Sequence, residues 1–374
     1  MQAALPAAVP APTYPAFKVV TPNQSCSTLE RMPKWLVCLP LVVQWLWLAL
    51  RYQSLTLPTI ANPAITAGGL VGEGKLEYFE SMGPIALAAT AAYCAVPTHK
   101  RYTGTELYNI MQRSDLSFPV IAKPDMGLCG HGVRRIGNYS ELMAYVSAFP
   151  VDETVVLQQY LPQEGEAGIF YCRDPDAGND AGSGRIIGLA LRYFPRVTGD
   201  GESTNAQLIA ANPRAQRLLN SSCHEPNYNP DAVPAVAEVV RLATIGSTRV
   251  GGLYCDGQQY ITAQLTHAID AIARDIPAFY FGRFDVRFDS LNDLAAGCGF
   301  SVMEINGAGS EAIQAWDPDT SVMAGFGMIF KKQRILFAIG NAMRSRGFKP
   351  LGILALAQLN HRQNRLLRQY PPSN

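Results

Sequence analysis

Charged and apolar residues alternate in a short segment of the C-terminal half. Arg283 to Asp289 reads RFDVRFD. Successive side chains of a β-strand point to opposite faces, so Arg283, Asp285 and Arg287 would share one face and the intervening apolar residues the other. Such a strand would bury its apolar face and hold two guanidinium groups beside a carboxylate.

A second segment supplies groups that complement the first. Ser301 to Ser310 reads SVMEINGAGS, in which Glu304 and Asn306 project to the same side of a strand. If the two strands pair antiparallel, Asp285, Glu304 and Asn306 converge into one oxygen-rich cluster. Carboxylate and amide oxygens suit Mg2+ beside nucleotide phosphates. The alternative is a half-exposed hairpin with solvated charges, in which a Gly-Ala-Gly directly after the asparagine is unusual.

A third segment combines a lysine with a glycine-rich loop. Phe118 to Val133 reads FPVIAKPDMGLCGHGV, a strand that delivers Lys123 followed by Gly127, Gly130 and Gly132. A lysine at a strand end can reach phosphate oxygens, and glycines let backbone N–H groups approach them. The spacing matches neither a Walker A loop nor a dinucleotide-binding fingerprint. A simple hairpin is the alternative interpretation.

These groups need strands and helices to position them, and the sequence from Phe118 onward alternates between the two. FPVIAKP, VVLQQYL, IIGLALRYFP, RFDVRF and FSVMEIN are predicted strands. Helices are predicted from Ser140 to Phe149, with Ser140 as N-cap, and from Thr262 to Arg274. Before this body, Ile85 to Val96 is predicted as an alanine-rich helix. The pattern indicates an α+β body without internal repeats.

Taken in order along the chain, these motifs resemble the ATP-grasp superfamily, especially D-alanine:D-alanine ligase and cyanophycin synthetase-like enzymes. The resemblance covers Phe118 to Ser310, roughly half of the chain. It implies an ATP-grasp fold, in which two α+β subdomains clasp ATP. An atypical helical N-terminal region and a helical, basic C-terminal tail would flank it.

The resemblance also implies roles for particular residues. ATP phosphates would contact the flap residues Lys123, Gly127, Gly130 and Gly132. The hinge backbone at Gln159, Tyr160 and Leu161 would hold adenine, and Glu166 the ribose. Magnesium, or manganese in its place, would bind Asp285, Glu304 and Asn306. Arg283 would steady the reacting carboxyl group and, with the backbone N–H groups near Gly309, the tetrahedral oxyanion.

A further loop, RYFPRVTGDGESTNAQLI, resembles the V-x-G-D-G-x-S-T loop of the cyanophycin synthetase type. Glycines on both sides of Asp200 favour a mobile loop, and Asp200 or Ser203 can cap a following helix. Arg192 and Arg196 beside it are candidates to steady the transferred phosphoryl group, the alternative being ordinary surface arginines. The sequence departs from the family at Gln158, where many relatives have an acidic residue.

The activity that the resemblance implies is ATP-dependent carboxylate–amine ligation through an acyl phosphate. The substrates would be a small-molecule carboxylate and an amine, and the products an amide or peptide bond, ADP and phosphate. Two alternatives stay open at the level of sequence. One is a membrane-associated nucleotide-binding protein without ligase activity, and the other is an ATP-grasp kinase that stops at phosphoryl transfer.

Composition narrows the class of protein. The 374 residues include 31 Lys and Arg against 30 Asp and Glu, and 48% are apolar, which excludes a disordered polyelectrolyte. The net charge of +1 gives no global reason to bind nucleic acid. Eight scattered cysteines without a C-x-x-C pair favour neither a zinc site nor a disulfide framework, and indicate a reduced, cytoplasmic setting. The oligomeric state is left open.

Apolar residues concentrate from Trp35 to Leu50, in WLVCLPLVVQWLWLAL. A helix of this length is shorter than the roughly 30 Å hydrocarbon core of a bilayer, and Pro40 interrupts it. A buried helix is the favoured prediction and an interfacial segment the alternative. Residues 321–374 carry nine Lys and Arg and no acidic residue. The favoured prediction is a helical tail that packs its apolar face on the body and leaves its basic residues in water, and the alternative is peripheral contact with an anionic membrane.

The chain is expected to divide into four parts. Residues 1–24 form a flexible, Pro- and Ala-rich tail, and residues 25–112 an N-terminal region around the tryptophan-rich helix. Residues 113–320 form the ATP-grasp domain and residues 321–374 the basic helical tail.

Overall fold

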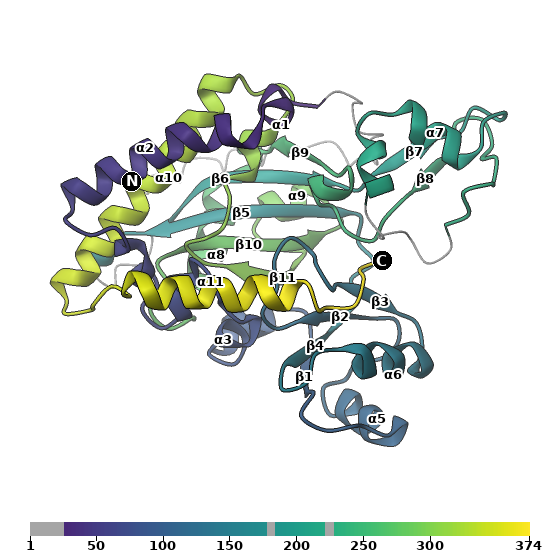
Figure 1. Ribbon diagram of the computed structural model, residues 1–374, viewed down its shortest axis with the longest axis horizontal. Coiled ribbons are helices and arrows are strands. Elements are labelled where there is room, and N and C mark those ends of the chain that lie inside the picture. Colours follow the sequence, from purple (N-terminus) through teal and green to yellow (C-terminus); the bar gives the residue numbers. More distant parts are fainter. Residues whose placement is uncertain (1–25, 178–183, 221–227) are drawn as a thin grey trace, which may run out of the picture.

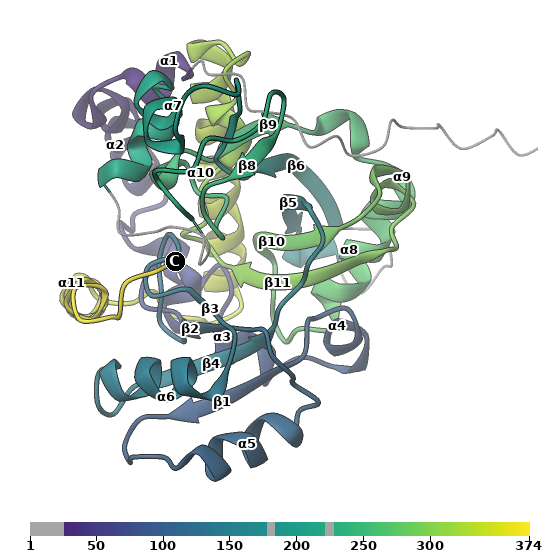
Figure 2. The same cartoon turned by 90° about the vertical axis from the view of Figure 1, so that its right-hand side faces the viewer.

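The computed structural model describes residues 26–177, 184–220 and 228–374. Its described part contains two larger antiparallel sheets and one two-stranded sheet, with helices packed around them (Figure 1). Figure 2 shows the smaller sheet below the larger one, so that two α+β units face each other. The predicted α+β class, with a helical N-terminal region and a helical C-terminal tail, is confirmed.

The larger sheet has the strand order β11-β10-β5-β6-β9, antiparallel throughout. Its strands are β5 (Gly165–Arg173), β6 (Gly184–Tyr193), β9 (Leu253–Asp256), β10 (Phe281–Phe288) and β11 (Phe300–Asn306). One face packs on helix α8 (Ala263–Arg274), whose side chains Leu265 and Ile269 join Phe284 and Val286 in the main core. Helix α9 (Leu291–Ala295) lies in the connection between β10 and β11. The opposite face carries the charged residues.

The smaller sheet has the strand order β1-β4-β2-β3. Its strands are β1 (Tyr93–Pro97), β2 (Val120–Pro124), β3 (Arg134–Ile136) and β4 (Thr154–Gln159). Helices α5 (Gly104–Gln112) and α6 (Tyr139–Ala148) cover one face, and their Leu107 and Leu142 share a second core with the strands. Asn138, two residues before the predicted Ser140, caps α6 by accepting the Glu141 N–H.

The segment from Ile85 to Val96 corrects a prediction. It is not one helix: α4 (Pro84–Ala88) ends early, and β1 follows, pairing antiparallel with β4. Strand formation is favoured here because Cys94 and Val96 enter the core of the smaller sheet, which outweighs the helix propensity of the alanines. Strand β1 precedes residue 113 and pairs within the smaller sheet. The expected domain boundary between residues 112 and 113 stays a prediction.

A third, small unit projects from the larger sheet. Strands β7 (Arg196–Thr198) and β8 (Val239–Arg241) pair beside helix α7 (Asn205–Ala211), as Figure 1 shows at the upper right. Thr204, and not Asp200 or Ser203, caps α7. Asp200 instead accepts hydrogen bonds from the backbone N–H groups of Glu202 and Ser203, which lower its pKa to about 2 together with the Ser203 hydroxyl, the largest influence.

Helices from both ends of the described chain flank the sheets, and the C-terminal helix lies apart from the others (Figure 2). They are α1 (Thr28–Arg31), α2 (Lys34–Arg51), α10 (Val322–Ser345) and α11 (Ile353–Leu367), with the short α3 (Lys75–Phe79) near the smaller sheet. Trp45 of α2 packs edge to face on Phe337 of α10, with ring centroids 5.0 Å apart. Helix α2 runs through Pro40 without a break.

The prediction that α2 is a buried helix is wrong. Only 11% of the helix is buried, and its outer apolar side chains lie on the surface. The helix packs on α10 along one side, and nothing among the described residues covers the other side. An apolar composition predicts burial but gives no sign of which face finds a partner.

Candidate active site

The charged face of the larger sheet is built by the β10–β11 pair. In the observed register Asp285 lies opposite Glu304, and Arg283 lies opposite Asn306. The structure therefore brings the three predicted metal ligands together, as the period-two pattern indicates. Asp285 is 1% exposed, so the segment is no solvated hairpin.

Asp285 is the centre of a hydrogen-bond network. Arg283 donates to both of its carboxylate oxygens, Nε to Oδ1 at 2.6 Å and Nη2 to Oδ2 at 2.9 Å. Asn306 Nδ2 donates to Oδ2 at 3.2 Å, and Arg192 Nη1 lies 3.4 Å from the same oxygen. This bidentate geometry is the strong form of an ion pair and fixes the arginine in place.

A second row of charges comes from β5 and β6. Glu166 of β5 is buried, and its oxygens pair with Arg192 at 2.8 Å and Arg287 at 3.3 Å. Arg192 and the nearby Arg196 are both largely buried, which is unlike ordinary surface arginines. Two guanidinium groups thus engage the Glu166 carboxylate. The ribose role that the resemblance implies for Glu166 stays a prediction.

Lysine side chains enter this face from the other elements. Lys123 of β2 is buried, and its Nζ donates to Gln158 Oε1 at 2.6 Å and to the Met303 carbonyl of β11 at 3.0 Å. It thus joins the smaller sheet to the larger one. Burial lowers the pKa of Lys123 to about 7, although the nearby Glu304 acts in the opposite direction. Gln158 provides a neutral acceptor for this amine.

Residues 68–75, GGLVGEGK, make a further contribution that none of the predicted motifs includes. Lys75 Nζ lies 3.3 Å from Glu304 Oε1 and also donates to the Asp125 carbonyl at 3.3 Å. Glu304 remains 34% exposed, far more than Asp285, and so is the accessible carboxylate. Loss of water opposes ionisation of Glu304, but Lys75 and Lys123 outweigh it and lower its pKa to about 2.

Glu73 of the same segment is buried against the loop that follows β11. Its carboxylate accepts the Gly307 N–H at 3.2 Å and a short hydrogen bond from the Tyr78 hydroxyl. Burial raises the pKa of Glu73 to about 7, even though these two donors lower it. Four glycines, a glutamate and a lysine within eight residues are the signal in the sequence that distinguishes this segment from an ordinary turn-rich connection.

The same packing bears on the predicted oxyanion donor. The Gly309 N–H donates to the Gly69 carbonyl at 2.6 Å, and the Ala308 N–H donates to the Gly68 carbonyl at 3.1 Å. The Gly309 N–H is thus engaged by a carbonyl in this structure, and the oxyanion role predicted for the backbone near Gly309 stays a prediction.

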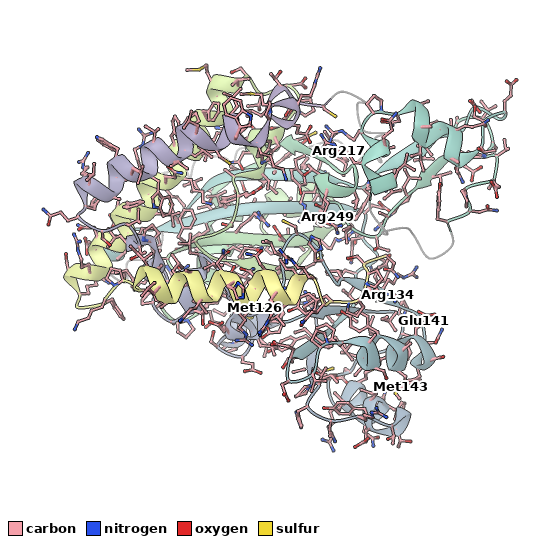
Figure 3. All side chains as sticks on the ribbon, in the orientation of Figure 1. Met126, Arg134, Glu141, Met143, Arg217 and Arg249 are labelled. Atoms are coloured by element: carbon pink, nitrogen blue, oxygen red, sulfur yellow. The ribbon has the colours of Figure 1, made fainter. Side chains whose placement is uncertain are left out.

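The predicted flap connects β2 and β3. Gly130 and Gly132 both have φ of +73°, a conformation that side-chain-bearing residues rarely adopt. A Cβ on Gly127 would lie 3.1 Å from Lys75 Nζ, so this glycine keeps space for the amine. Arg249 Nε donates to the Cys129 carbonyl of the flap at 3.3 Å, and Figure 3 labels Arg249.

The predicted hinge lies where the chain passes from the smaller to the larger sheet. Gln159 ends β4, and its N–H donates to the Ala92 carbonyl at 2.8 Å. Tyr160 follows, with Arg135 4.7 Å above its ring, and Leu161 is buried. The position is that of a linker between the two units, while adenine binding there stays a prediction.

A cavity of about 250 Å³ adjoins the site at the loop after β11. Its apolar walls include Trp45 of α2 and Leu336 of α10. Its polar groups include Glu311, whose carbonyl accepts a hydrogen bond from Arg283, and Lys332, whose Nζ donates to the Ser310 carbonyl. Burial lowers the pKa of Lys332 to about 8. The cavity thus combines apolar walls with the polar side chains of Glu311, Lys332 and Gln333.

The charges of the site do not balance. Five cationic side chains lie beside three carboxylates, which leaves an excess of two positive charges when Lys123 is protonated. The cations are Lys75, Lys123, Arg192, Arg283 and Arg287, and the carboxylates are Glu166, Asp285 and Glu304. The buried Nε of Arg192 donates to no group within the described residues. An excess of buried positive charge with an unused donor is typical of a site for an anion such as phosphate.

The metal prediction can be tested against the donor set. Among the described residues, no group of three or more His, Cys, Asp or Glu side chains is placed to hold a metal ion. The predicted set of Asp285, Glu304 and Asn306 offers two carboxylates and an amide, all hard oxygen donors that fit Mg2+. Glu304 is ionised and accessible, whereas Asp285 has both oxygens engaged by Arg283. The chemistry fits, with Glu304 as the leading ligand.

Comparison with known proteins places this geometry in context. No family model matches the chain, and neither does any curated protein. Solved structures do match it. A bifunctional glutathione synthetase from Pasteurella multocida is 17% identical with a TM-score of 0.34, over 66% of this chain and 35% of that one.

Two ligases are also among the matches. A D-alanine–D-alanine ligase from Bacillus anthracis is 14% identical with a TM-score of 0.43, over 76% of this chain and 72% of that one. The VanG D-Ala:D-Ser ligase from Enterococcus faecalis is 12% identical with a TM-score of 0.40, over 73% and 64%. The chain thus spans about a third of the synthetase and roughly two thirds of the ligases.

Proposed function

We propose that this chain is an ATP-dependent ligase that joins a carboxylate to an amine through an acyl phosphate. The observation that carries the proposal is the excess of positive charge on the inner face of the larger sheet. Lys123 and Lys75 approach this face from other elements, where a phosphate chain held between the two units would meet them. ATP supplies such a chain of phosphates, and the hinge at Tyr160 and Leu161 would hold its base.

The residues of the site divide the work of phosphoryl transfer. Arg192 and Lys123 would bind phosphate oxygens, and the unused Nε of Arg192 is a donor ready for one. Arg283 would orient the substrate carboxylate, because its guanidinium is held rigidly by Asp285. Glu304, Asn306 and Asp285 would hold Mg2+, which when bound neutralises charge on the phosphates. Catalysis of this kind rests mainly on positioning and electrostatic stabilisation.

The amine would then attack the acyl phosphate to give an amide and phosphate. The cavity beside Glu311 and Lys332 is the space where the part of the substrate that does not react would lie. Its apolar walls favour a substrate with apolar groups. The reaction would proceed in the cytoplasm, in agreement with seven described cysteines that are all free.

The test is ADP release by the purified chain with Mg-ATP, screened across amino acids and dipeptides. Hydroxylamine in a parallel series traps an acyl phosphate as a hydroxamate. A ligase gives ADP that depends on both acid and amine, with hydroxamate from the acid alone. A kinase gives stoichiometric phosphorylated product with no dependence on an amine, and a binding protein gives no ADP above background with any acid.

A further inference from the structure

Helix α2 carries a continuous apolar stripe on its outer face. The stripe follows the i, i+4, i+7, i+11, i+15 spacing of one helix face and runs for about 23 Å. Each of its members is at least half exposed: Trp35, Leu39, Val42, Leu46 and Leu50. Val43 and Trp47, beside the stripe, are exposed to the same degree. Contiguous apolar patches of this size on a protein surface mark an interaction site.

The opposite face of α2 is firmly attached to the protein. Gln44 Nε2 donates to the Phe330 carbonyl of α10 at 3.2 Å, and Gln333 Nε2 of α10 donates to the Leu41 carbonyl at 3.3 Å. Leu48 is buried in the core that α2 shares with α10. Within the described residues α2 is the one helix long and apolar enough to cross a membrane, by length and composition alone. Its contacts with α10 between Leu41 and Leu48 hold the helix lengthwise against the protein, with its outer face toward solvent.

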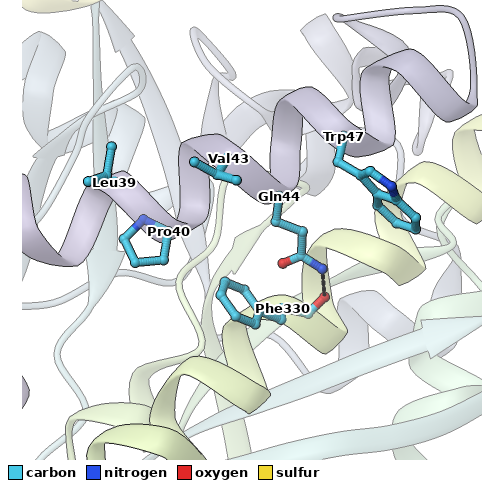
Figure 4. Close-up of a pocket in the computed structure, with 6 residues that line it drawn as sticks. All are labelled: Leu39, Pro40, Val43, Gln44, Trp47 and Phe330. Carbon is cyan, nitrogen blue, oxygen red and sulfur yellow. Dashed lines mark hydrogen bonds between the residues drawn. The ribbon is translucent and has the colours of Figure 1, made fainter.

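A shallow groove between α2 and α10 adds to this surface. Figure 4 shows its lining, with Val43 and Trp47 of α2 facing Phe330 of α10 across the Gln44 hydrogen bond. The groove has a volume of about 540 Å³. Apart from the Gln44 side chain its lining residues are apolar. A hydrocarbon chain or an inserted methyl group can fill such a space.

The charged residues that the sequence places at the two ends of α2 are basic. Arg31 and Lys34 lie at one end of α2 and Arg51 at the other, and the sequence has no acidic residue between Arg31 and Glu73. Glu30, just before this stretch, turns inward to pair with Arg214 at 2.7 Å. The surface available to a partner is therefore apolar in the middle and basic at both ends.

The turn between α10 and α11 extends the same surface. Arg344 Nη1 donates to the Tyr52 carbonyl at 2.7 Å, and the Leu351 N–H donates to Thr59 Oγ1 at 2.9 Å, so this turn lies beside the end of α2. Further exposed apolar and basic side chains lie in or next to the turn: Phe348, Lys349, Ile353 and Leu354. Figure 1 shows the turn at the left end of the molecule, next to α2.

We propose that this surface, the outer face of α2 with the α10–α11 turn, docks on an anionic lipid bilayer. The apolar stripe would enter the boundary between headgroups and acyl chains, where tryptophan is favoured. The basic residues at its ends would meet acidic headgroups. The proposal concerns a face that the ligase site does not use, so it stands independently of the proposed function.

Charge distinguishes a bilayer from a second copy of the chain. A two-fold contact through α2 would bring Arg31 and Lys34 of one copy toward the basic residues of the other. No acidic residue of this stretch is available to offset the repulsion, whereas anionic lipid offsets it directly. Charge complementarity therefore favours the membrane surface.

The test is co-sedimentation of the full chain with phosphatidylcholine vesicles containing 0 or 30% phosphatidylglycerol, at low and high salt. We expect binding to the anionic vesicles at least tenfold tighter than to the neutral ones, weakened by salt. The emission of Trp35 and Trp47 should shift to the blue and be quenched by brominated lipid. A chain that stays in the supernatant with anionic vesicles at low salt would overturn the proposal.

Variants distinguish the apolar from the electrostatic contribution to vesicle binding, and a membrane from a second copy of the chain as the partner. Leu46→Ser with Leu50→Ser should weaken vesicle binding at least tenfold, and Lys34→Glu with Arg51→Glu should remove its dependence on anionic lipid. The matched control is Leu219→Ser with Val236→Ser, which changes exposed apolar residues elsewhere and should bind as the wild type does. A dimer in light scattering that Leu46→Ser with Leu50→Ser dissociates, without lipid binding, would assign the surface to a second copy instead.

Discussion

Proteins usually bury apolar residues and expose charged ones. The inner face of the larger sheet departs from this by burying charged residues, and the outer face of α2 departs from it by exposing apolar ones. On the sheet, charged groups such as Asp285 and Glu166 are buried, where they are held by ion pairs. On the helix, leucines and tryptophans are exposed without a partner in the described structure. Both arrangements cost stability and persist in proteins mainly where a ligand or surface makes use of them. The two regions differ in that the sheet carries its partners within the chain, whereas the helix requires an external one.

The largest effect is expected at Glu304, the accessible carboxylate of the site. Glu304→Gln should lower amide formation at least about 100-fold, because it removes a negative charge where metal-bound phosphate develops charge in the transition state. ATP binding, measured by calorimetry, should largely remain. Glu106→Gln on α5 is the control and should leave the rate unchanged. Wild-type ADP release by the Glu304 variant with a verified substrate would remove the centre of the ligase proposal.

The next largest effect is expected on the free energy of unfolding, where the buried ion pair of the sheet is compared with an exposed one. Arg283→Ala should lower the free energy of unfolding by about 3 kcal/mol, because it leaves the buried Asp285 with weaker partners. Arg362→Ala, which breaks an exposed pair with Glu153, should cost less than about 1 kcal/mol. Urea unfolding measures both. Equal costs would mean that the Asp285 network contributes no more than a surface ion pair.

Lys123 should show an intermediate effect that depends on pH. Lys123→Ala should weaken ATP binding roughly tenfold, since a charge-assisted contact to phosphate contributes about 1.5 to 3 kcal/mol. The wild-type affinity should fall as pH rises through about 7, the pKa of the buried amine, and the variant should lack this step. Calorimetry at pH 6, 7 and 8.5 tests both statements, and an affinity that is flat with pH would place the phosphates away from Lys123.

The lowered pKa of Lys123 also makes the free energy of unfolding depend on pH. Burial lowers the pKa of Lys123 from 10.5 to about 7, so between these pH values the folded chain has released a proton that the unfolded chain retains. Wild-type stability relative to Lys123→Met should therefore rise as pH increases from 7 to 10.5, and stay constant below 7. Urea unfolding of both chains across this range measures the difference.

The smallest effect is expected on the outer face of α2. Leu46→Ser with Leu50→Ser should leave the free energy of unfolding within about 0.5 kcal/mol of the wild type, because both side chains are already exposed. Leu48→Ala, on the buried face of the same helix, should cost about 2 to 5 kcal/mol. A large cost of the double serine variant would show that the stripe is packed against part of the chain.

The fold and the central strands of the site are predictable from the sequence for a local reason. Alternation with period two determines which side chains share a face, so the spacing alone is enough to group Asp285, Glu304 and Asn306. The hinge after Gln159 can be located because a change of element is visible in the sequence. Both inferences rely on residues that lie close together along the chain.

Features that depend on distant partners cannot be predicted in this way. Lys75 and Glu73 reach the site because their segment packs on Gly307, more than two hundred residues away. The strand Tyr93–Pro97 forms because β4 accepts it, against the local preference of an alanine-rich segment. The exposure of α2 likewise depends on which elements cover it, and an apolar sequence gives no information about that.

The contact between Lys123 and the Met303 carbonyl has a kinetic consequence. This amine connects the two units of the protein when no ligand engages it, and a nucleotide that takes the amine must break that contact and the one to Gln158. Separation of the two units would then limit the rate of nucleotide binding. The observed rate of ATP association should level off at high ATP concentration instead of rising in proportion, and the plateau should increase at higher pH, where the uncharged amine holds the units together less strongly.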